Sequence, residues 1–315
     1  MTQVDLPPVD RVEITTLMDN YTDILLPSTE VMQRHPLADK TGRPREQPLA
    51  GHGFSLLIDV YRDGERHTAL LDAGFPTPGV EYNWRVLNVD LARIETVLLS
   101  HGHADHFAAL ASFLAARGQR VPLVVHPAAF EKRALIFPDG AKADLERLPP
   151  PEALTEMGAD IVLSTRPHPL APGLFSTGEV ARTTAFEKPP ATAYIDLEDE
   201  WAPDDFRDDQ AIVVRLRGQG LVIVTGCAHA GIVNTVRHAQ AITGEPRVHA
   251  IVGGFHLTGA APAQIDATIH EITALDPAVI VPAHCTGFHA QCEFARRFPG
   301  RFALNSVGTC IVLTA

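Results

Sequence analysis

The sequence has 315 residues, 45% of them hydrophobic, so it can bury a large core in one or two domains. Its net charge of −12 argues against nucleic-acid binding, which depends on clustered Lys and Arg side chains. The four cysteines lack the spacing of a disulfide-stapled domain, and neither a signal-peptide pattern nor a membrane-spanning apolar run is present. We therefore expect a cytoplasmic protein with reduced thiols and a small-molecule substrate, without nucleic-acid or membrane partners.

Short segments rich in Val, Ile and Leu recur along the chain and predict β-strands. The first two, 54–60 and 68–71, flank the turn sequence 62–65 and predict a hairpin. Later strands alternate with segments whose apolar residues recur every three or four positions, as in amphipathic helices, so the order indicates an α/β fold. The later strands are predicted at 96–99, 122–125, 211–216, 221–225, 248–252 and 278–281, and helices at 107–117, 232–242, 263–275 and 291–298.

The segment from about 137 to 209 shows the weakest pattern. It contains a proline-rich stretch at 148–151 and an acidic stretch at 196–209. We interpret it as a loop and cap insertion over a single domain that spans 1–315. A flexible insertion with no role in the site fits the composition equally well.

Four potential metal ligands lie in one short turn between the predicted strand 96–99 and the helix that follows. They are His101, His103, Asp105 and His106. Imidazole and carboxylate groups are the ligands expected for Zn²⁺ and similar divalent ions. Alternate residues of such a turn can converge on one point while a neighbouring pair faces another, so the sequence predicts two adjacent metal subsites.

Residues 100–106, SHGHADH, resemble the HxHxDH signature of the metallo-β-lactamase superfamily. This resemblance implies a four-layer αββα sandwich and one or two bound Zn²⁺ ions, with Mn²⁺ or Fe as alternatives. It adds His229 to His101 and His103 in the first subsite, and His284 to Asp105 and His106 in the second. A histidine at a helix amino terminus is the alternative for His229, and a core histidine is the alternative for His284.

For three further residues the sequence is compatible with more than one role. Asp72, in LLDAG, resembles the superfamily's first motif, whose Asp braces the metal loop; alternatively it only starts a turn before Gly74. Cys227 falls where many relatives carry a metal-bridging Asp, and either a thiolate ligand or a buried structural thiol fits. For His256, metal ligation, support of a ligand and substrate contact all remain open.

The motifs GCAH, GGFHL and PAHCTG, together with segments 14–20, 51–55 and 176–182, resemble a narrower family. It is the family labelled 7,8-dihydropterin-6-methyl-4-(β-ribofuranosyl)aminobenzene 5′-phosphate synthase-like, or MBL-fold metallohydrolase. By this resemblance His52, Glu179 and Arg182 contact substrate, although surface or fold-supporting roles fit as well. Two departures, FAAL in place of TGGL at 107–110 and VA in place of IP at 180–181, affect a helix start and the cap.

These observations predict metal-assisted hydrolysis of a small ester-like substrate, such as a phosphoester or lactone. A metal-activated water attacks, and Asp105 is the catalytic residue that orients it or carries its proton. The alternatives are the carbon–nitrogen bond formation named in the family label and a non-catalytic metal- or ligand-binding module. A nuclease of the same superfamily is opposed by the negative charge.

Overall fold

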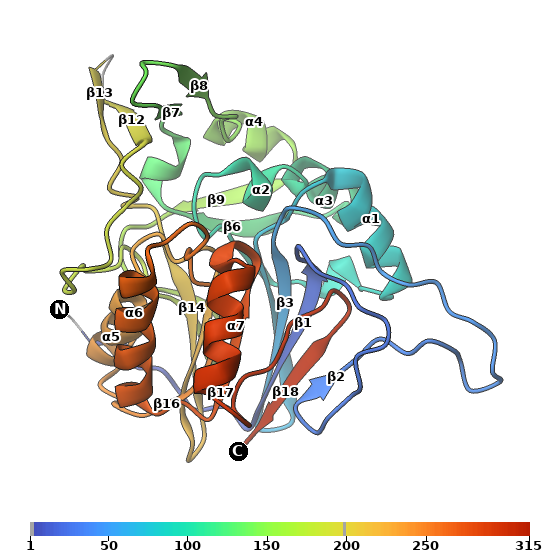
Figure 1. Cartoon of the computed structure of the whole chain (residues 1–315). Helices are drawn as coiled ribbons and strands as arrows, with labels where there is room; N and C mark the ends of the chain where they lie inside the picture. The colour runs from blue at the N-terminus through green and yellow to red at the C-terminus, as the bar shows by residue number, and fades with distance from the viewer. Residues whose placement is uncertain (1–2, 198–199) are drawn as a thin grey trace.

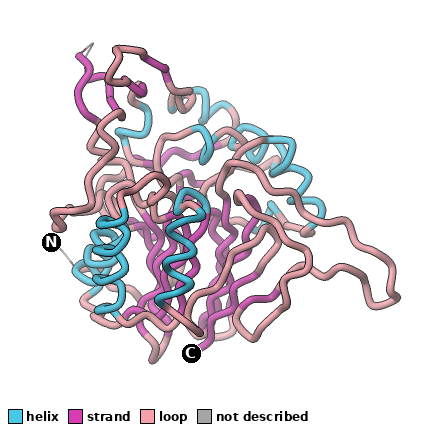
Figure 2. Tube along the Cα trace, viewed as in Figure 1, coloured by secondary structure: helices cyan, strands magenta, loops and turns pink. Residues whose placement is uncertain are grey.

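Two β-sheets pack face to face, and helices cover the outer face of each sheet (Figure 1, Figure 2). The computed structural model describes residues 3–197 and 200–315. One apolar core lies between the sheets, and a further apolar core lies under the helices on each side. The layers therefore run helix, sheet, sheet, helix, and the expected αββα sandwich is confirmed.

The larger sheet has eight strands in the order β2-β18-β1-β3-β4-β5-β6-β9. Arg62 and Glu65 pair across the turn between β3 and β4, so the predicted hairpin is confirmed. Strands β4, β5, β6 and β9 run parallel, so their carboxyl ends meet at one edge. The strands are β1 (Arg11–Met18), β2 (Met32–Gln33), β3 (Ser55–Arg62), β4 (Glu65–Leu71), β5 (Thr96–Leu98), β6 (Val121–Val125), β9 (Ala159–Leu163) and β18 (Cys310–Thr314).

The smaller sheet has six strands in the order β10-β11-β14-β15-β16-β17. Strands β15, β16 and β17 run parallel, and each lies within a few residues of its predicted bounds. Their nearly continuous apolar sequences are typical of strands that are covered on both faces. The strands are β10 (His168–Ala171), β11 (Leu174–Ser176), β14 (Ala211–Leu216), β15 (Gly220–Thr225), β16 (Val248–Gly254) and β17 (Val279–Ala283).

The helices form the two outer layers. Helices α5, α6 and α7 pack on the smaller sheet, and α1 and α3 pack on the larger one (Figure 1). No helix within the described residues is long and apolar enough to cross a bilayer. The helices are α1 (Thr77–Val86), α2 (Ala104–Phe107), α3 (Leu110–Arg117), α4 (Pro151–Glu156), α5 (Ile232–Thr243), α6 (Pro262–Leu275) and α7 (Phe288–Arg297), with 3-10 turns η1 (Leu91–Arg93), η2 (Pro127–Phe130) and η3 (His284–Thr286).

The helix predicted at 107–117 is divided in the structure, so this prediction is corrected. The backbone N–H of Ala109 donates to the carbonyl of Gly74 at 3.1 Å and not to a helical partner. This contact separates α2 from α3 and ties the break to the end of β4. Helix α2 also begins earlier than predicted, at Ala104, and itself carries Asp105 and His106.

Segment 137–209 contributes to all three sheets of the fold. It supplies β9 to the larger sheet and β10 and β11 to the smaller sheet. Its remaining strands join β7 in a separate four-stranded sheet above the sandwich (Figure 1). The segment therefore builds edges of the sandwich as well as most of this separate sheet. The separate sheet contains β7 (Arg133–Ile136), β8 (Lys142–Asp144), β12 (Ala193–Leu197) and β13 (Glu200–Pro203).

Candidate metal centre

The expected ligands lie where strands of both sheets end at one edge of the sandwich. In the larger sheet, β5 leads into the turn that carries His101 and His103. In the smaller sheet, β15 leads to His229, and β17 leads directly to His284. Parallel strands place their carboxyl ends side by side, so residues far apart in the sequence meet here.

His101, His103 and His229 turn their ring nitrogens toward one another. Nε2 of His101 lies 3.1 Å from Nδ1 of His103 and 3.2 Å from Nε2 of His229. Nitrogens bound ~2.05 Å from a tetrahedral ion are themselves about 3.3 Å apart, so this arrangement fits a divalent cation. One cation also satisfies three acceptor nitrogens together, whereas a hydrogen bond between rings needs one donor for each acceptor.

Asp105, His106 and His284 form a second donor group beside the first. Oδ2 of Asp105 lies 3.2 Å from Nε2 of His284 and 3.6 Å from Nε2 of His106. Buried polar atoms normally have partners, but Nε2 of His284, although close to Asp105, has none with hydrogen-bond geometry among the described residues. A cation held by this group would satisfy it, so the donors fit a second divalent ion.

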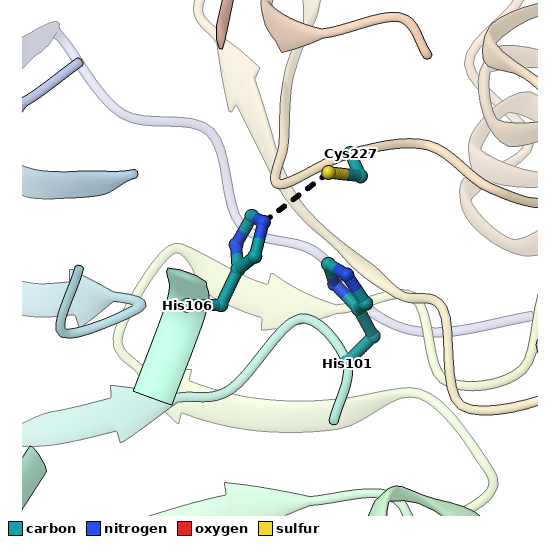
Figure 3. Close-up of side chains that lie close together, drawn as sticks. All are labelled: His101, His106 and Cys227. Atoms are coloured by element: carbon teal, nitrogen blue, oxygen red, sulfur yellow. Dashed lines mark hydrogen bonds between the residues drawn. The ribbon is translucent and has the colours of Figure 1, made fainter. Parts of the chain in front are cut away.

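Cys227 faces the buried rings of His101 and His106 (Figure 3). Its Sγ is 3.2 Å from Nε2 of His106, and it forms a donor group with His101 and His106 whose ligand atoms lie within 4.8 Å of one another. Figure 3 shows the two rings and the sulfur facing a common space. The position suits a thiolate ligand, and the burial of the side chain also suits a structural thiol.

Asp72 and Ser100 hold the ring nitrogens that face away from the donor groups. Oδ2 of Asp72 is 2.6 Å from Nδ1 of His106 and accepts the Ser100 hydroxyl at 2.8 Å, while Oδ1 accepts the Ser100 N–H at 2.7 Å. The Ser100 hydroxyl is also 2.9 Å from Nδ1 of His101. This placement supports the bracing role for Asp72, since such contacts fix the orientation of a ligating imidazole.

We predict that Asp72→Asn weakens metal binding at the second donor group by about 10- to 100-fold, the usual effect of losing such a brace. Asparagine keeps the size but removes the charge that holds His106. Chelator competition measures the dissociation constant. Asp160→Asn, a change at an exposed carboxylate on β9, is the control. Equal affinities for the two variants would show that Asp72 only shapes its turn.

Burial and neighbouring charges set the protonation of the two groups. Burial, followed by the nearby imidazoles of His106 and His229, keeps the pKa of His101 well below its usual range. Burial also lowers the pKa of His106, but the carboxylates of Asp105 and Asp72 outweigh this effect and raise it to about 9. Burial raises the pKa of Asp105, but the imidazoles of His106 and His284 hold it well below its usual range. A metal ion bound at the second group would therefore displace a proton from His106 at neutral pH.

A cavity of 830 Å³ opens onto both donor groups, with His103 and Asp105 in its lining. His52 also lines it; the side chain is 69% exposed, and Nε2 is 3.7 Å from Oδ2 of Asp105. Glu179 lies elsewhere, 3.7 Å from His126. Arg182 does not line the cavity. It donates to the carbonyl of His229 at 3.2 Å and so supports the loop that carries this histidine.

His256 and Cys285 lie beside the two groups. The rings of His256 and His229 are 4.1 Å apart between centroids, and both His256 and Cys285 line the cavity. Together with Cys227 they form a separate cluster whose potential ligand atoms lie within 4.8 Å of one another. Sequence reasoning missed Cys285, because nothing in the PAHCTG motif distinguishes an inward from an outward thiol.

Two other supporting residues were also missed. Asp19, directly after β1, accepts the backbone N–H of His284 at 2.9 Å. Phe206 stacks on His229 with ring centroids 4.1 Å apart. The position of Asp19 at the end of a strand, within the family motif 14–20, was a usable signal. Phe206 lies in the weakly patterned segment and offered none.

The fold and the paired donor groups define a metallo-β-lactamase protein. The sequence profile described as the metallo-beta-lactamase superfamily matches residues 49–284, so the chain belongs to that superfamily. A crystal structure of a metal-dependent hydrolase of the beta-lactamase superfamily superposes with a TM-score of 0.74 at 23% identity. The match covers 96% of this chain and 100% of the other, and it shows the shared fold.

Within the superfamily, the chain belongs to the pterin-phosphate synthase-like family. It is 32% identical over 262 residues to the 7,8-dihydropterin-6-methyl-4-(beta-D-ribofuranosyl)-aminobenzene-5'-phosphate synthase of Methanocaldococcus jannaschii. That alignment covers 82% of this chain and 89% of the synthase. An uncharacterized protein of the same organism is 26% identical over 264 residues, covering 84% of this chain and 94% of that protein.

Proposed function

We propose that this protein is a metal-dependent hydrolase that attacks a small ester-like substrate with a metal-activated water. The observation that carries the proposal is that members of both donor groups, His103 and His229 from one and Asp105 and His284 from the other, line a single cavity. Imidazole and carboxylate donors suit Zn²⁺, which we propose as the metal, and Mn²⁺ or Fe would also fit. Enzymatic relatives in the superfamily support catalysis over binding alone.

The chain's own residues support this chemistry. A bound divalent ion would lower the pKa of a water ligand to ~7 and supply hydroxide at neutral pH. Asp105 reaches the cavity with a side chain that is 23% exposed, and its Oδ2 faces His106 and His284. One carboxylate oxygen can ligate while the other accepts a proton from the nucleophile. Asp72 fixes the His106 ring and so keeps the donors in place during turnover.

The cavity wall beyond the donor groups supports a small, weakly charged substrate. Its residues include Tyr21, Phe288, Phe302 and Leu304, which offer an apolar surface. Among the described residues, no lysine or arginine lines the cavity. A phosphate remote from the reacting bond would therefore lack the cationic side chains that usually bind it. A lactone, thioester or phosphoester whose reacting group contacts the metal directly fits this cavity better.

A substrate screen tests the proposal. The zinc-loaded protein is assayed against lactones, thioesters, phosphodiesters and phosphomonoesters. We expect turnover of at least one class, its loss on chelation and its recovery with Zn²⁺. Phe288→Ala, which trims the apolar wall, is expected to raise KM more than it lowers kcat, since it removes substrate contact without touching the donors. A protein with full metal occupancy that hydrolyses none of these classes would favour the non-catalytic binding module.

Carbon–nitrogen bond formation is the second candidate, favoured by the 32% identity to the Methanocaldococcus jannaschii synthase. Its test is incubation with a dihydropterin and an aminobenzene phosphate partner, with product detection by mass spectrometry. The absence of cationic side chains from the described cavity lining argues against the phosphate-bearing partner. Product formation without hydrolysis of any ester would replace the hydrolase proposal.

A further inference from the structure

Three side chains outside the six expected ligands converge at the same edge of the sandwich. Cys227, His256 and Cys285 offer two sulfurs and a ring nitrogen that lie within 4.8 Å of one another. They follow β15, β16 and β17, three adjacent parallel strands. All three line the 830 Å³ cavity, so the cluster is reachable by the same route as the histidine-rich donor groups. We call these three residues the thiol cluster.

The backbone is shaped to bring the thiol cluster together. Gly254 leaves room for the Cys285 sulfur, because a Cβ at that position would lie 2.7 Å from it. His256 has a φ of +44°, a left-handed conformation that is uncommon for non-glycine residues and that places its ring beside the two thiols. Cys285 in turn directs its Sγ to the carbonyl of Cys227 at 3.5 Å. Packing alone does not require an imidazole and two thiols to meet at this point.

His256 also has an unmet bonding requirement. Its Nδ1 is buried and has no hydrogen-bond partner among the described residues. Buried nitrogens in native structures are normally paired, so an orphaned one indicates a missing partner such as an ion or a water. The thiols nearby favour an ion, because two sulfurs are poor hydrogen-bond partners for a water but good ligands for a borderline cation.

We propose that Cys227, His256 and Cys285 bind an additional zinc-type ion beside the two histidine-rich donor groups. Two thiolates and one imidazole form the donor set of open, catalytic zinc sites, in which a fourth position stays free. That position would face the cavity. The thiolates supply the negative charge that another dication requires so close to the first two. Cys227 joins the sites, because its Sγ is 3.2 Å from Nε2 of His106.

Cobalt titration of the metal-free, reduced protein tests this proposal. Thiolate-bound Co²⁺ gives a near-ultraviolet charge-transfer band that histidine and carboxylate ligands do not produce. We expect the intact protein to bind a third equivalent of Co²⁺ as the band reaches its full intensity. Cys285→Ser should lose that equivalent and most of the band, since the ion that both thiolates bind is gone. Any band that remains would come from Cys227 on the ion beside His106. His256→Gln should lose the equivalent while both thiols remain.

Cys292→Ser is the matched control, because Cys292 lines the same cavity but lies outside the thiol cluster. It should keep the full stoichiometry and the full band. If Cys285→Ser does not fold, as judged by circular dichroism, His256→Gln provides the same test. Cys285→Ser with unchanged stoichiometry and band would overturn the proposal, and so would a Cys227–Cys285 disulfide in the protein as isolated. Ion counts are independent of turnover, so the hydrolase proposal stands or fails separately.

Discussion

His103→Ala is expected to abolish turnover, with a loss of more than about 10²-fold, and to lower bound metal by about one equivalent. Nδ1 of His103 is one of three nitrogens that converge in the first donor group, 3.1 Å from Nε2 of His101. Its removal leaves His101 and His229 as the donors of that group, and two ligands hold a divalent ion far more weakly than three. Metal analysis after dialysis, together with kcat on the substrate found by screening, measures both effects.

The control for His103→Ala is His270→Ala. His270 is exposed on α6 and belongs to neither donor group, so its replacement should leave metal content and turnover unchanged. Thermal unfolding of both metal-free variants separates loss of the ion from loss of the fold. Full metal occupancy with normal turnover in His103→Ala would show that these three histidines do not form a metal subsite.

The local part of the site could be predicted from sequence because its determinants are local. Strand β5, the HxHxDH motif and the following helix are adjacent in the chain, and the apolar pattern of the strand indicates where the motif begins. The hairpin of β3 and β4 is likewise determined by residues 62–65 and the apolar strands on either side. Pairings of this kind need no information about distant parts of the chain.

The site residues that are distant from the HxHxDH motif in sequence could be predicted only with the help of the family resemblance. His229 lies 128 residues from His101 in sequence, and nothing in the periodicity of its strand indicates which turn it faces. The contact between Asp19 and His284 spans 265 residues and follows from how the two sheets pack. The thiol cluster depends on the missing Cβ of Gly254, a feature of tertiary packing. Local patterns carry no signal for such contacts.

The strands of segment 137–209 were missed for a different reason. Edge strands are short and half exposed, so they lack the continuous apolar pattern of central strands. β9 has mostly partly exposed residues, and β10 contains Pro169, which is tolerated at an edge but argues against a strand in sequence analysis. The acidic and proline-rich composition then suggested a cap for the whole segment.

Asp105→Asn tests whether Asp105 acts in catalysis in addition to binding metal. Asparagine keeps the size of Asp105 and one oxygen that can ligate, but it removes the negative charge and the proton acceptor. Burial raises the pKa of Asp105, but the imidazoles of His106 and His284 outweigh burial and hold the pKa well below its usual range. Asp105 is therefore ionised throughout the neutral range. The substitution therefore removes a charge that is always present at working pH.

We expect Asp105→Asn to lower turnover by about 10²-fold or more, the scale of a lost acid–base group, while metal at His101, His103 and His229 is retained. These two measurements separate the duties of the carboxylate, because only the second donor group contains Asp105. Asp266→Asn, at an exposed site on α6, should change neither. Loss of all bound metal would make Asp105 mainly structural. Near-normal turnover would contradict the proposed mechanism, since no other carboxylate in the described residues lines the cavity beside both donor groups.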